Sequence, residues 1–193
     1  MGLFFIMRFS IKISILLAGI WFLGKYILFS FQLFQTTEQY SYHVMWNILC
    51  LLFAMTIGSW IEKRRSVGKE SNVLSDMKNI LAPGLVYTIL VSGMIYFYYA
   101  KIDPSYNEKQ LFLVENSMKE MVNDPVKLKK FKEQRPEFEA FSKEEILKKS
   151  RESIQPWYTP KTSMIIALLG MLMLSIINAL ILTIIYRKVL FRS

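Results

Sequence analysis

Four long apolar runs restrict what this chain can fold into. They cover residues 11–34, 43–61, 80–100 and 164–186. A core of 193 residues that folds in water cannot bury a sequence that is 53% apolar and 15% aromatic. An α-helix needs about 20 apolar residues to cross roughly 30 Å of hydrocarbon, and each run is close to that length. The sequence therefore predicts an all-α fold: a four-helix transmembrane bundle with a helical extramembrane insertion between the third and fourth transmembrane helices.

The first run could be taken for a secretory signal, because Arg8 and Lys12 lie at its start. It is longer than the apolar part of such a signal, and no small-residue cleavage pattern follows it. We therefore expect a retained transmembrane helix over residues 11–34.

The polar segment between the third and fourth runs divides the chain into two parts. We expect a transmembrane bundle made of residues 1–100 and 163–193, and an extracytoplasmic helical insertion made of residues 101–162. Because the apolar residues of the insertion recur at helical spacing, we expect it to fold.

Start and stop signals predict three helices in the insertion. The first covers about residues 105–122. Asp124–Pro125 supplies a capping acid followed by proline at the first helical position, which begins a second, shorter helix that ends at Pro136. Ser142–Glu145 matches a capping box and begins the third helix, which should end near Gln155.

Positive charge gathers beside the apolar runs and not in the insertion. Residues 101–162 hold 13 Lys or Arg and 11 Asp or Glu, whereas the rest of the chain holds 11 and 4. A nucleic-acid-binding domain needs a concentrated basic face. We therefore expect no nucleic-acid partner, and we expect the lipid bilayer to surround the bundle.

The basic residues of the short segments predict an orientation. Two lie at the start of the first run or just before it, five lie in residues 62–79 and three follow the fourth run, whereas residues 35–42 contain none. Short segments rich in Lys and Arg stay in the cytoplasm. Both termini should therefore be cytoplasmic, with residues 101–162 on the far side.

Small residues spaced four apart occur in each run, and such residues let membrane helices approach closely. The alternative is that they fall at this spacing by chance. The rows are Ser14 and Ala18; Cys50, Ala54 and Gly58; Gly84, Thr88 and Ser92; Ser175 and Ala179. Among these, we expect helix packing to depend on Gly58, Gly84, Ser92, Ser175 and Ala179.

Lys25 and Asn178 are the candidate functional residues. Lys25 is the one charge well inside an apolar run, and an ionisable residue in that position is a functional candidate. It also lies about one and a half helical turns from the outer boundary, so its side chain could instead extend to the headgroups. Asn178 and Asn47 could line a polar path or hydrogen-bond across helices, and the second role is the more common one.

No motif for catalysis or cofactor binding is present in the sequence. His43 and Cys50 are the single histidine and the single cysteine, so neither a zinc site nor an intramolecular disulfide is expected. Catalytic triads, glycine-rich phosphate loops and paired inward carboxylates are also missing. We therefore expect no enzyme activity, no metal and no cofactor.

Two short stretches carry a resemblance to a known family. Tyr99–Pro104, at the end of the third run, and Asp76–Lys78, ahead of that run, resemble the domain of unknown function 4199 family, integral membrane proteins of bacteria of the Bacteroidetes type. The resemblance covers about Ile11–Tyr186. It implies a multi-pass protein of the bacterial inner (plasma) membrane, and the orientation expected from the basic residues then places residues 101–162 in the periplasm. It implies no assigned activity and no catalytic residues.

Two functions remain open. The first is a non-enzymatic accessory or scaffold subunit of the cell envelope, which binds a protein partner or associates with itself through residues 101–162. The alternative is a small lipid or solute carrier that uses Lys25 and Asn178.

Overall fold

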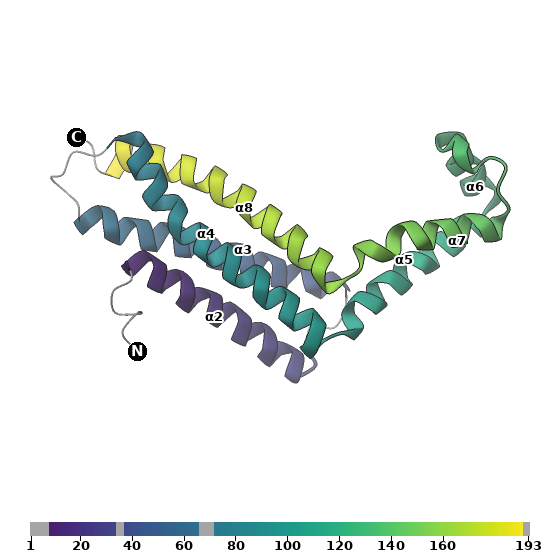
Figure 1. Cartoon of the computed structure of the whole chain (residues 1–193), viewed down its shortest axis with the longest axis horizontal. Coiled ribbons are helices and arrows are strands. Elements are labelled where there is room, and N and C mark those ends of the chain that lie inside the picture. Colours follow the sequence, from purple (N-terminus) through teal and green to yellow (C-terminus); the bar gives the residue numbers. More distant parts are fainter. Residues whose placement is uncertain (1–7, 34–36, 66–71, 191–193) are drawn as a thin grey trace. The chain divides into compact units, whose positions relative to one another are not determined.

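The computed structural model describes residues 8–33, 37–65 and 72–190. Contacts divide the chain into two compact units (Figure 1). Unit 1 consists of residues 1–94 and 166–193, and unit 2 consists of residues 95–165. The described residues form helices and no strand, and four of the helices are long and apolar enough to span a membrane. The predicted fold class is therefore confirmed.

Unit 1 is a bundle of four helices that lie side by side, with successive helices running in opposite directions (Figure 1). The helices are α2 (Phe9–Ser30), α3 (Thr37–Arg65), α4 (Val73–Phe97) and α8 (Pro160–Ile185), and the π-helix η4 (Tyr186–Leu190) continues α8. The last residues of α4 and the first residues of α8 belong to unit 2. This alternation brings the start of α2, the end of α3, the start of α4 and η4 to one end of the bundle.

The helices do not end where the apolar runs end. Residues 62–79 separate the second and third apolar runs, but α3 continues to Arg65 and α4 begins at Val73, where the side chain of Asn72 accepts a hydrogen bond from the Ser75 amide at 2.7 Å. Hydropathy marks only the part of a helix inside hydrocarbon, whereas backbone hydrogen bonding continues beyond it.

Unit 1 buries hydroxyl, amide and small side chains together with large apolar ones such as Leu51, Met55 and Tyr87, and many other large apolar side chains lie on its outside. The exposed apolar side chains suit a lipid environment, and the buried hydroxyls and amides can bond between helices. The buried polar residues include Ser10, Ser14, Asn47, Ser59, Thr88, Ser92, Ser175 and Thr183. The exposed apolar residues include Leu16, Leu23, Phe53, Ile89, Met173 and Ile184.

Two glycines lie where helices approach most closely. A Cβ atom on Gly58 would lie 3.1 Å from the Cα of Ser10 in α2, and one on Gly84 would lie 2.8 Å from the Sδ of Met55 in α3 and 3.1 Å from the Oγ of Ser175 in α8. Larger side chains would push these helices apart. Ser92, Ser175 and Ala179, the other packing candidates, are also buried.

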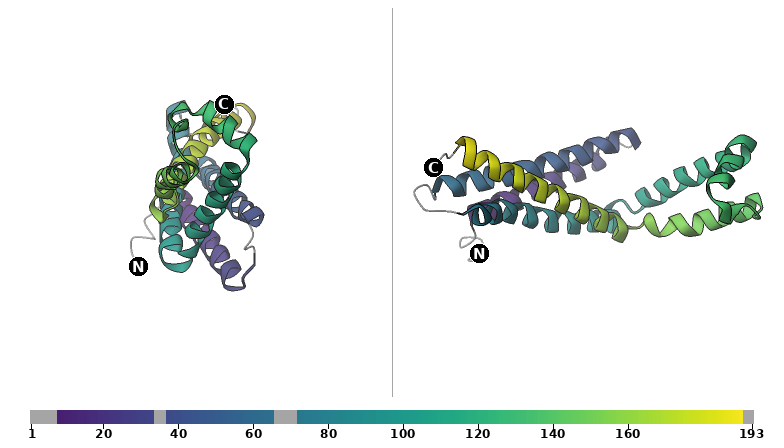
Figure 2. Two further views of the ribbon diagram at one scale, coloured as in Figure 1. Left: turned by 90° about the vertical axis from the view of Figure 1, so that its right-hand side faces the viewer. Right: turned by 90° about the horizontal axis from the view of Figure 1, so that it is seen from above.

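Unit 2 is a pair of helices, α5 and α7, connected at one end through α6 (Figure 2). Its elements are η1 (Tyr98–Ile102), α5 (Ser105–Asn123), α6 (Pro125–Gln134), η2 (Pro136–Phe138), α7 (Lys143–Ile154) and η3 (Gln155–Trp157). The three predicted insertion helices are confirmed, with α5 ending one residue beyond the prediction. An ion pair of 2.9 Å between Arg151 and Glu115 joins α7 to α5.

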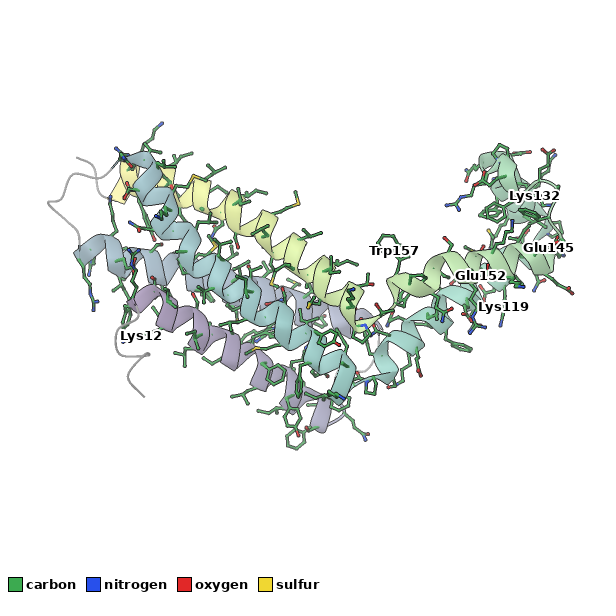
Figure 3. The ribbon with its side chains drawn as sticks, in the orientation of Figure 1. Lys12, Lys119, Lys132, Glu145, Glu152 and Trp157 are labelled. Carbon is green, nitrogen blue, oxygen red and sulfur yellow. The ribbon has the colours of Figure 1, made fainter. Side chains whose placement is uncertain are left out.

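The caps of α6 and α7 are those that their sequences predict. The Asp124 carboxylate accepts hydrogen bonds from the amides of Val126 and Lys127 at 2.9 and 3.2 Å. The Ser142 amide donates to the Glu145 carboxylate at 2.8 Å, and the Glu145 amide donates to the Ser142 hydroxyl at 3.3 Å. The hydrogen bond from the Ser142 amide holds the pKa of Glu145 below its ordinary value. Figure 3 shows Glu145 on unit 2.

A leucine at position 58 should destabilise the bundle, because α2 leaves no room for it. We expect Gly58→Leu to lower the melting temperature in detergent, with overpacking costing about 1–3 kcal/mol. Gly93→Leu is the matched control, since a Cβ atom on Gly93 would meet nothing within 4 Å. Equal melting temperatures for the two variants would contradict the close approach of α2 and α3.

Candidate functional site

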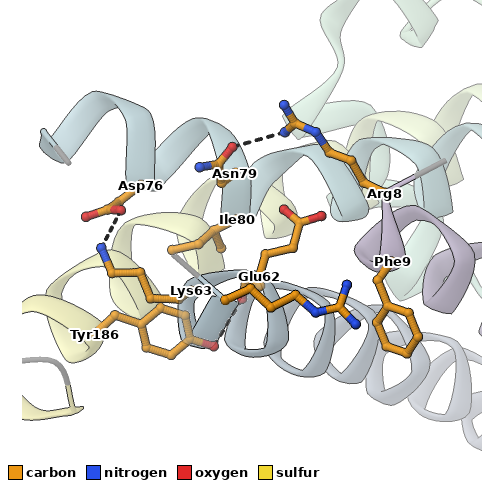
Figure 4. A pocket seen from close by; sticks show the side chains of 10 residues that line it. Arg8, Phe9, Glu62, Lys63, Asp76, Asn79, Ile80 and Tyr186 are labelled. Carbon is orange, nitrogen blue, oxygen red and sulfur yellow. Dashed lines mark hydrogen bonds and ion pairs between the residues drawn. The ribbon is translucent and has the colours of Figure 1, made fainter. Parts of the chain in front are cut away.

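A pocket of about 320 Å³ lies at the end of unit 1 where α2 and α4 begin and α3 ends (Figure 4). We call it the end pocket. Its lining residues come from all four segments at this end: Arg8, Phe9, Ser59, Glu62, Lys63, Arg65, Asp76, Asn79, Ile80 and Tyr186. The pocket combines charged, polar and aromatic side chains that are far apart in the sequence.

Asp76 is the most deeply buried charged residue of the end pocket, with 4% of its side chain exposed. One carboxylate oxygen lies 2.7 Å from the Nζ of Lys63 in α3, and the other lies 3.2 Å from the Nη1 of Arg187 in η4. Figure 4 shows the first of these contacts. Because each oxygen faces a cation, the negative charge of Asp76 is neutralised inside the protein, and three helical segments are joined.

Hydroxyl and amide groups connect the other helices at this end. Ser10 in α2 donates a hydrogen bond to the Glu62 carboxylate in α3 at 2.6 Å. Arg8 donates to the side-chain oxygen of Asn79 in α4 at 3.2 Å. Tyr186 lies 3.0 Å from the Ser59 hydroxyl and donates to a backbone carbonyl of α3 at 2.9 Å. These contacts hold the side chains that surround the pocket.

Two arginines at the end pocket have neutral partners. Arg8 bonds to an amide oxygen, and the guanidinium of Arg65 lies over the ring of Phe9, 5.2 Å from its centre. Such contacts orient a guanidinium group but leave its charge in place. The Glu62 carboxylate likewise bonds to a neutral hydroxyl. The end pocket therefore presents both positive and negative charge to a ligand.

Lys25 lies inside unit 1, with 5% of its surface exposed. Its ammonium lies 5.6 Å from the centre of the Trp21 ring, one turn nearer the middle of α2. Its charge also acts on the imidazole of His43 at the start of α3. Lys25 thus lies in the half of the bundle away from the end pocket.

Asn178 lies on α8 with its amide nitrogen 3.5 Å from the Sδ of Met55. Met55 follows His43 by 12 positions in α3, which corresponds to roughly 18 Å along a helix. The structure therefore does not bring Lys25 and Asn178 together. Asn47 is held by Tyr87, whose hydroxyl donates to its side-chain oxygen at 2.8 Å.

Asp76, Arg8 and Glu62 were not among the candidate residues predicted from the sequence. A signal exists for two of them, because Glu62 and Asp76 are among only three acids in residues 62–79, a segment that holds five Lys or Arg. That signal does not specify which bases they contact. No group of three or more His, Cys, Asp or Glu residues that could hold a metal ion occurs in residues 8–33, 37–65 and 72–190.

Comparison with models of known protein families gave a match over most of the chain. A family model described as "Protein of unknown function (DUF4199)" matches residues 12–188. The matched stretch includes α3 to α8 and most of α2. No curated protein and no solved structure matches the chain.

Removing the charge of Asp76 should destabilise unit 1, because Lys63 and Arg187 would both lose the carboxylate that they contact. We expect Asp76→Asn to reduce the free energy of unfolding by about 2 kcal/mol, below the 3–5 kcal/mol typical of a fully buried pair, since both cations are partly exposed. Thermal unfolding in detergent measures this change.

Glu62→Gln is the matched control for that variant, since Glu62 bonds to a neutral hydroxyl. It should have the smaller effect. The double variant Asp76→Asn, Lys63→Met should recover part of the loss of stability, because it also removes one of the two cations that contacted the Asp76 carboxylate. If Glu62→Gln reduced the free energy of unfolding as much as Asp76→Asn, the result would contradict the larger contribution of Asp76 to the stability of unit 1.

Proposed function

The chain belongs to the DUF4199 family of proteins of unknown function, and we propose that it is a multi-pass inner-membrane protein of a bacterial cell envelope. In this proposal it acts as a non-enzymatic accessory or scaffold subunit. Unit 1 holds the protein in the bilayer, and unit 2 binds a protein partner or a second copy of the chain.

This proposal is supported above all by the buried polar groups of unit 1, which contact one another between helices. Ser14 donates to the Pro83 carbonyl of α4 at 2.8 Å, Tyr87 donates to Asn47 of α3, and Thr88 lies 3.4 Å from the Ser175 hydroxyl of α8. Each contact joins two helices. Polar groups engaged in this way stabilise a bundle, whereas a carrier would need them for its cargo.

Exposed apolar residues on unit 2 support a binding role. Phe112 and Leu113 are consecutive residues of α5, and 58% and 45% of their surfaces are exposed. They lie on a helix that also carries many charged residues. Aromatic and aliphatic side chains in a polar surrounding are typical of protein interfaces. We infer that this part of α5 contacts the partner.

Basic residues near the end pocket support the proposed orientation. Lys63–Arg65 end α3, and Arg187 and Lys188 lie in η4. Segments rich in Lys and Arg stay on the cytoplasmic side. We therefore propose that both termini and the end pocket are cytoplasmic and that unit 2 is periplasmic.

Labelling of single cysteines tests the orientation. In a Cys50→Ser background, cysteines at Gln110 and Glu139 of unit 2 should react with a membrane-impermeant thiol reagent in spheroplasts, because we expect both to face the periplasm. A cysteine at the exposed Val73 should react only after lysis. The reverse pattern would require the opposite orientation.

Site-specific photo-crosslinking tests the scaffold function. A photoreactive residue at Phe112 should give one discrete protein adduct in living cells, because we expect this side chain to be covered by the partner. The matched control is Glu152, an exposed residue of α7 in the same unit (Figure 3). Leu113→Lys should remove the Phe112 adduct, since it places a charge in the apolar contact.

Two results together would favour the carrier over the scaffold. In the cross-linking experiment, Phe112 and Glu152 would give equal amounts of adduct. In a separate purification, a lipid or solute would co-purify with the wild type and be lost from both Lys25→Arg and Asn178→Ala. Lys25→Arg retains charge and length, so a purely structural lysine should tolerate it.

A further inference from the structure

The end pocket lies where the apolar runs meet charged residues. The apolar run of α2 begins at Ile11, and that of α3 ends at Ile61. The residues of α2 and α3 that line the pocket lie close to these two positions in the sequence. Phe9 and Trp60 are partly exposed at the same end. Aromatic side chains in such positions are typical of the headgroup level of a bilayer. If the four helices cross the membrane, the pocket therefore faces lipid headgroups.

The charges of the end pocket fall into two classes. Asp76 is neutralised by Lys63 and Arg187. Arg8, Arg65 and Glu62, in contrast, bond to neutral groups among the residues that the structure describes. Neutral partners hold these side chains in place but leave their charges available to a ligand. The available set is thus two guanidinium groups and one carboxylate.

We propose that the end pocket binds the headgroup of a phospholipid that carries both a phosphate and a primary ammonium, as phosphatidylethanolamine does. Arg8 and Arg65 bind the phosphate, because guanidinium groups match its geometry with two parallel donors. Glu62 accepts hydrogen bonds from the ammonium. Pockets between transmembrane helices that are lined by basic residues are a known form of headgroup site.

Two properties of the pocket favour this headgroup over an acidic one. Glu62 would repel a headgroup with only negative charge, whereas it attracts an ammonium. The volume of about 320 Å³ is at the small end of the roughly 300–1,000 Å³ found for ligand pockets, which suits a compact headgroup with its acyl chains outside. The proposal requires only that unit 1 spans the membrane, so it is independent of the scaffold function.

Native mass spectrometry of the full chain in detergent, titrated with defined lipids, tests the proposal. We expect phosphatidylethanolamine to bind more tightly than phosphatidylglycerol, which lacks the ammonium, and than phosphatidylcholine, whose methylated ammonium cannot donate hydrogen bonds. Soluble phosphoethanolamine should bind much more weakly, because it has no acyl chains. Equal affinities for phosphoethanolamine and phosphatidylethanolamine would contradict the proposal that the ligand is a lipid.

Arg65→Gln should weaken the binding of phosphatidylethanolamine about tenfold, because it removes a charge-assisted contact to the phosphate. Arg64→Gln is the matched control: Arg64 is the neighbouring residue of α3, its guanidinium lies 4.4 Å from the centre of the Trp60 ring, and it is not among the residues that line the pocket. It should bind as the wild type does. An equal loss of affinity for phosphatidylethanolamine in the two variants would contradict the proposal that the end pocket is the binding site.

The variant Glu62→Gln distinguishes a site for a headgroup that carries both phosphate and ammonium from a site that binds any anion. It should abolish the preference for phosphatidylethanolamine and improve the binding of phosphatidylglycerol, because it removes a negative charge and retains the side-chain length. An unchanged preference would overturn the role of Glu62. Because Arg64 and Arg65 are exposed and Glu62 is partly exposed, melting temperatures near that of the wild type are expected for all three variants.

Discussion

The contact between Gly58 and Ser10 determines how close α2 and α3 come at one end of unit 1. Glycine permits this close approach, because a Cβ atom at position 58 would lie 3.1 Å from the Cα of Ser10, which is tighter than ordinary van der Waals contact. The same approach allows the Ser10 hydroxyl to reach Glu62, one turn further along α3. The position of Glu62 in the end pocket therefore depends on the absence of a side chain at Gly58.

Charge is used in two ways at this end of the bundle. Asp76 and its two cations connect α3, α4 and η4, and the negative charge of the carboxylate is neutralised within the protein. Arg8, Arg65 and Glu62 keep charges that neutral partners only orient. A neutralised group contributes to stability, whereas an oriented and uncompensated group is available for binding. The two groups lie in one pocket because all four helices of unit 1 contribute to it.

Unit 2 is organised by local signals and by a small number of contacts between helices. Its helices begin at capping residues, and Arg151 and Glu115 connect α7 with α5. Because its interior is small, apolar residues such as Phe112 remain on the surface. In the proposed function, this surface of unit 2 binds the partner while unit 1 lies in the bilayer.

The sequence by itself determined the helices, because hydropathy and capping are local properties. Four apolar runs predicted four membrane helices, and Asp124 and Ser142 predicted the starts of α6 and α7. Only the tertiary structure decided which charges meet. Asp76 and Arg187 are separated by 111 positions, and their pairing depends on the packing of four helices. In the same way, the sequence allowed Lys25 and Asn178 to line one path, but the fold places them at different depths of the bundle. The neighbours of a residue on one helix are decided only when other helices pack against it.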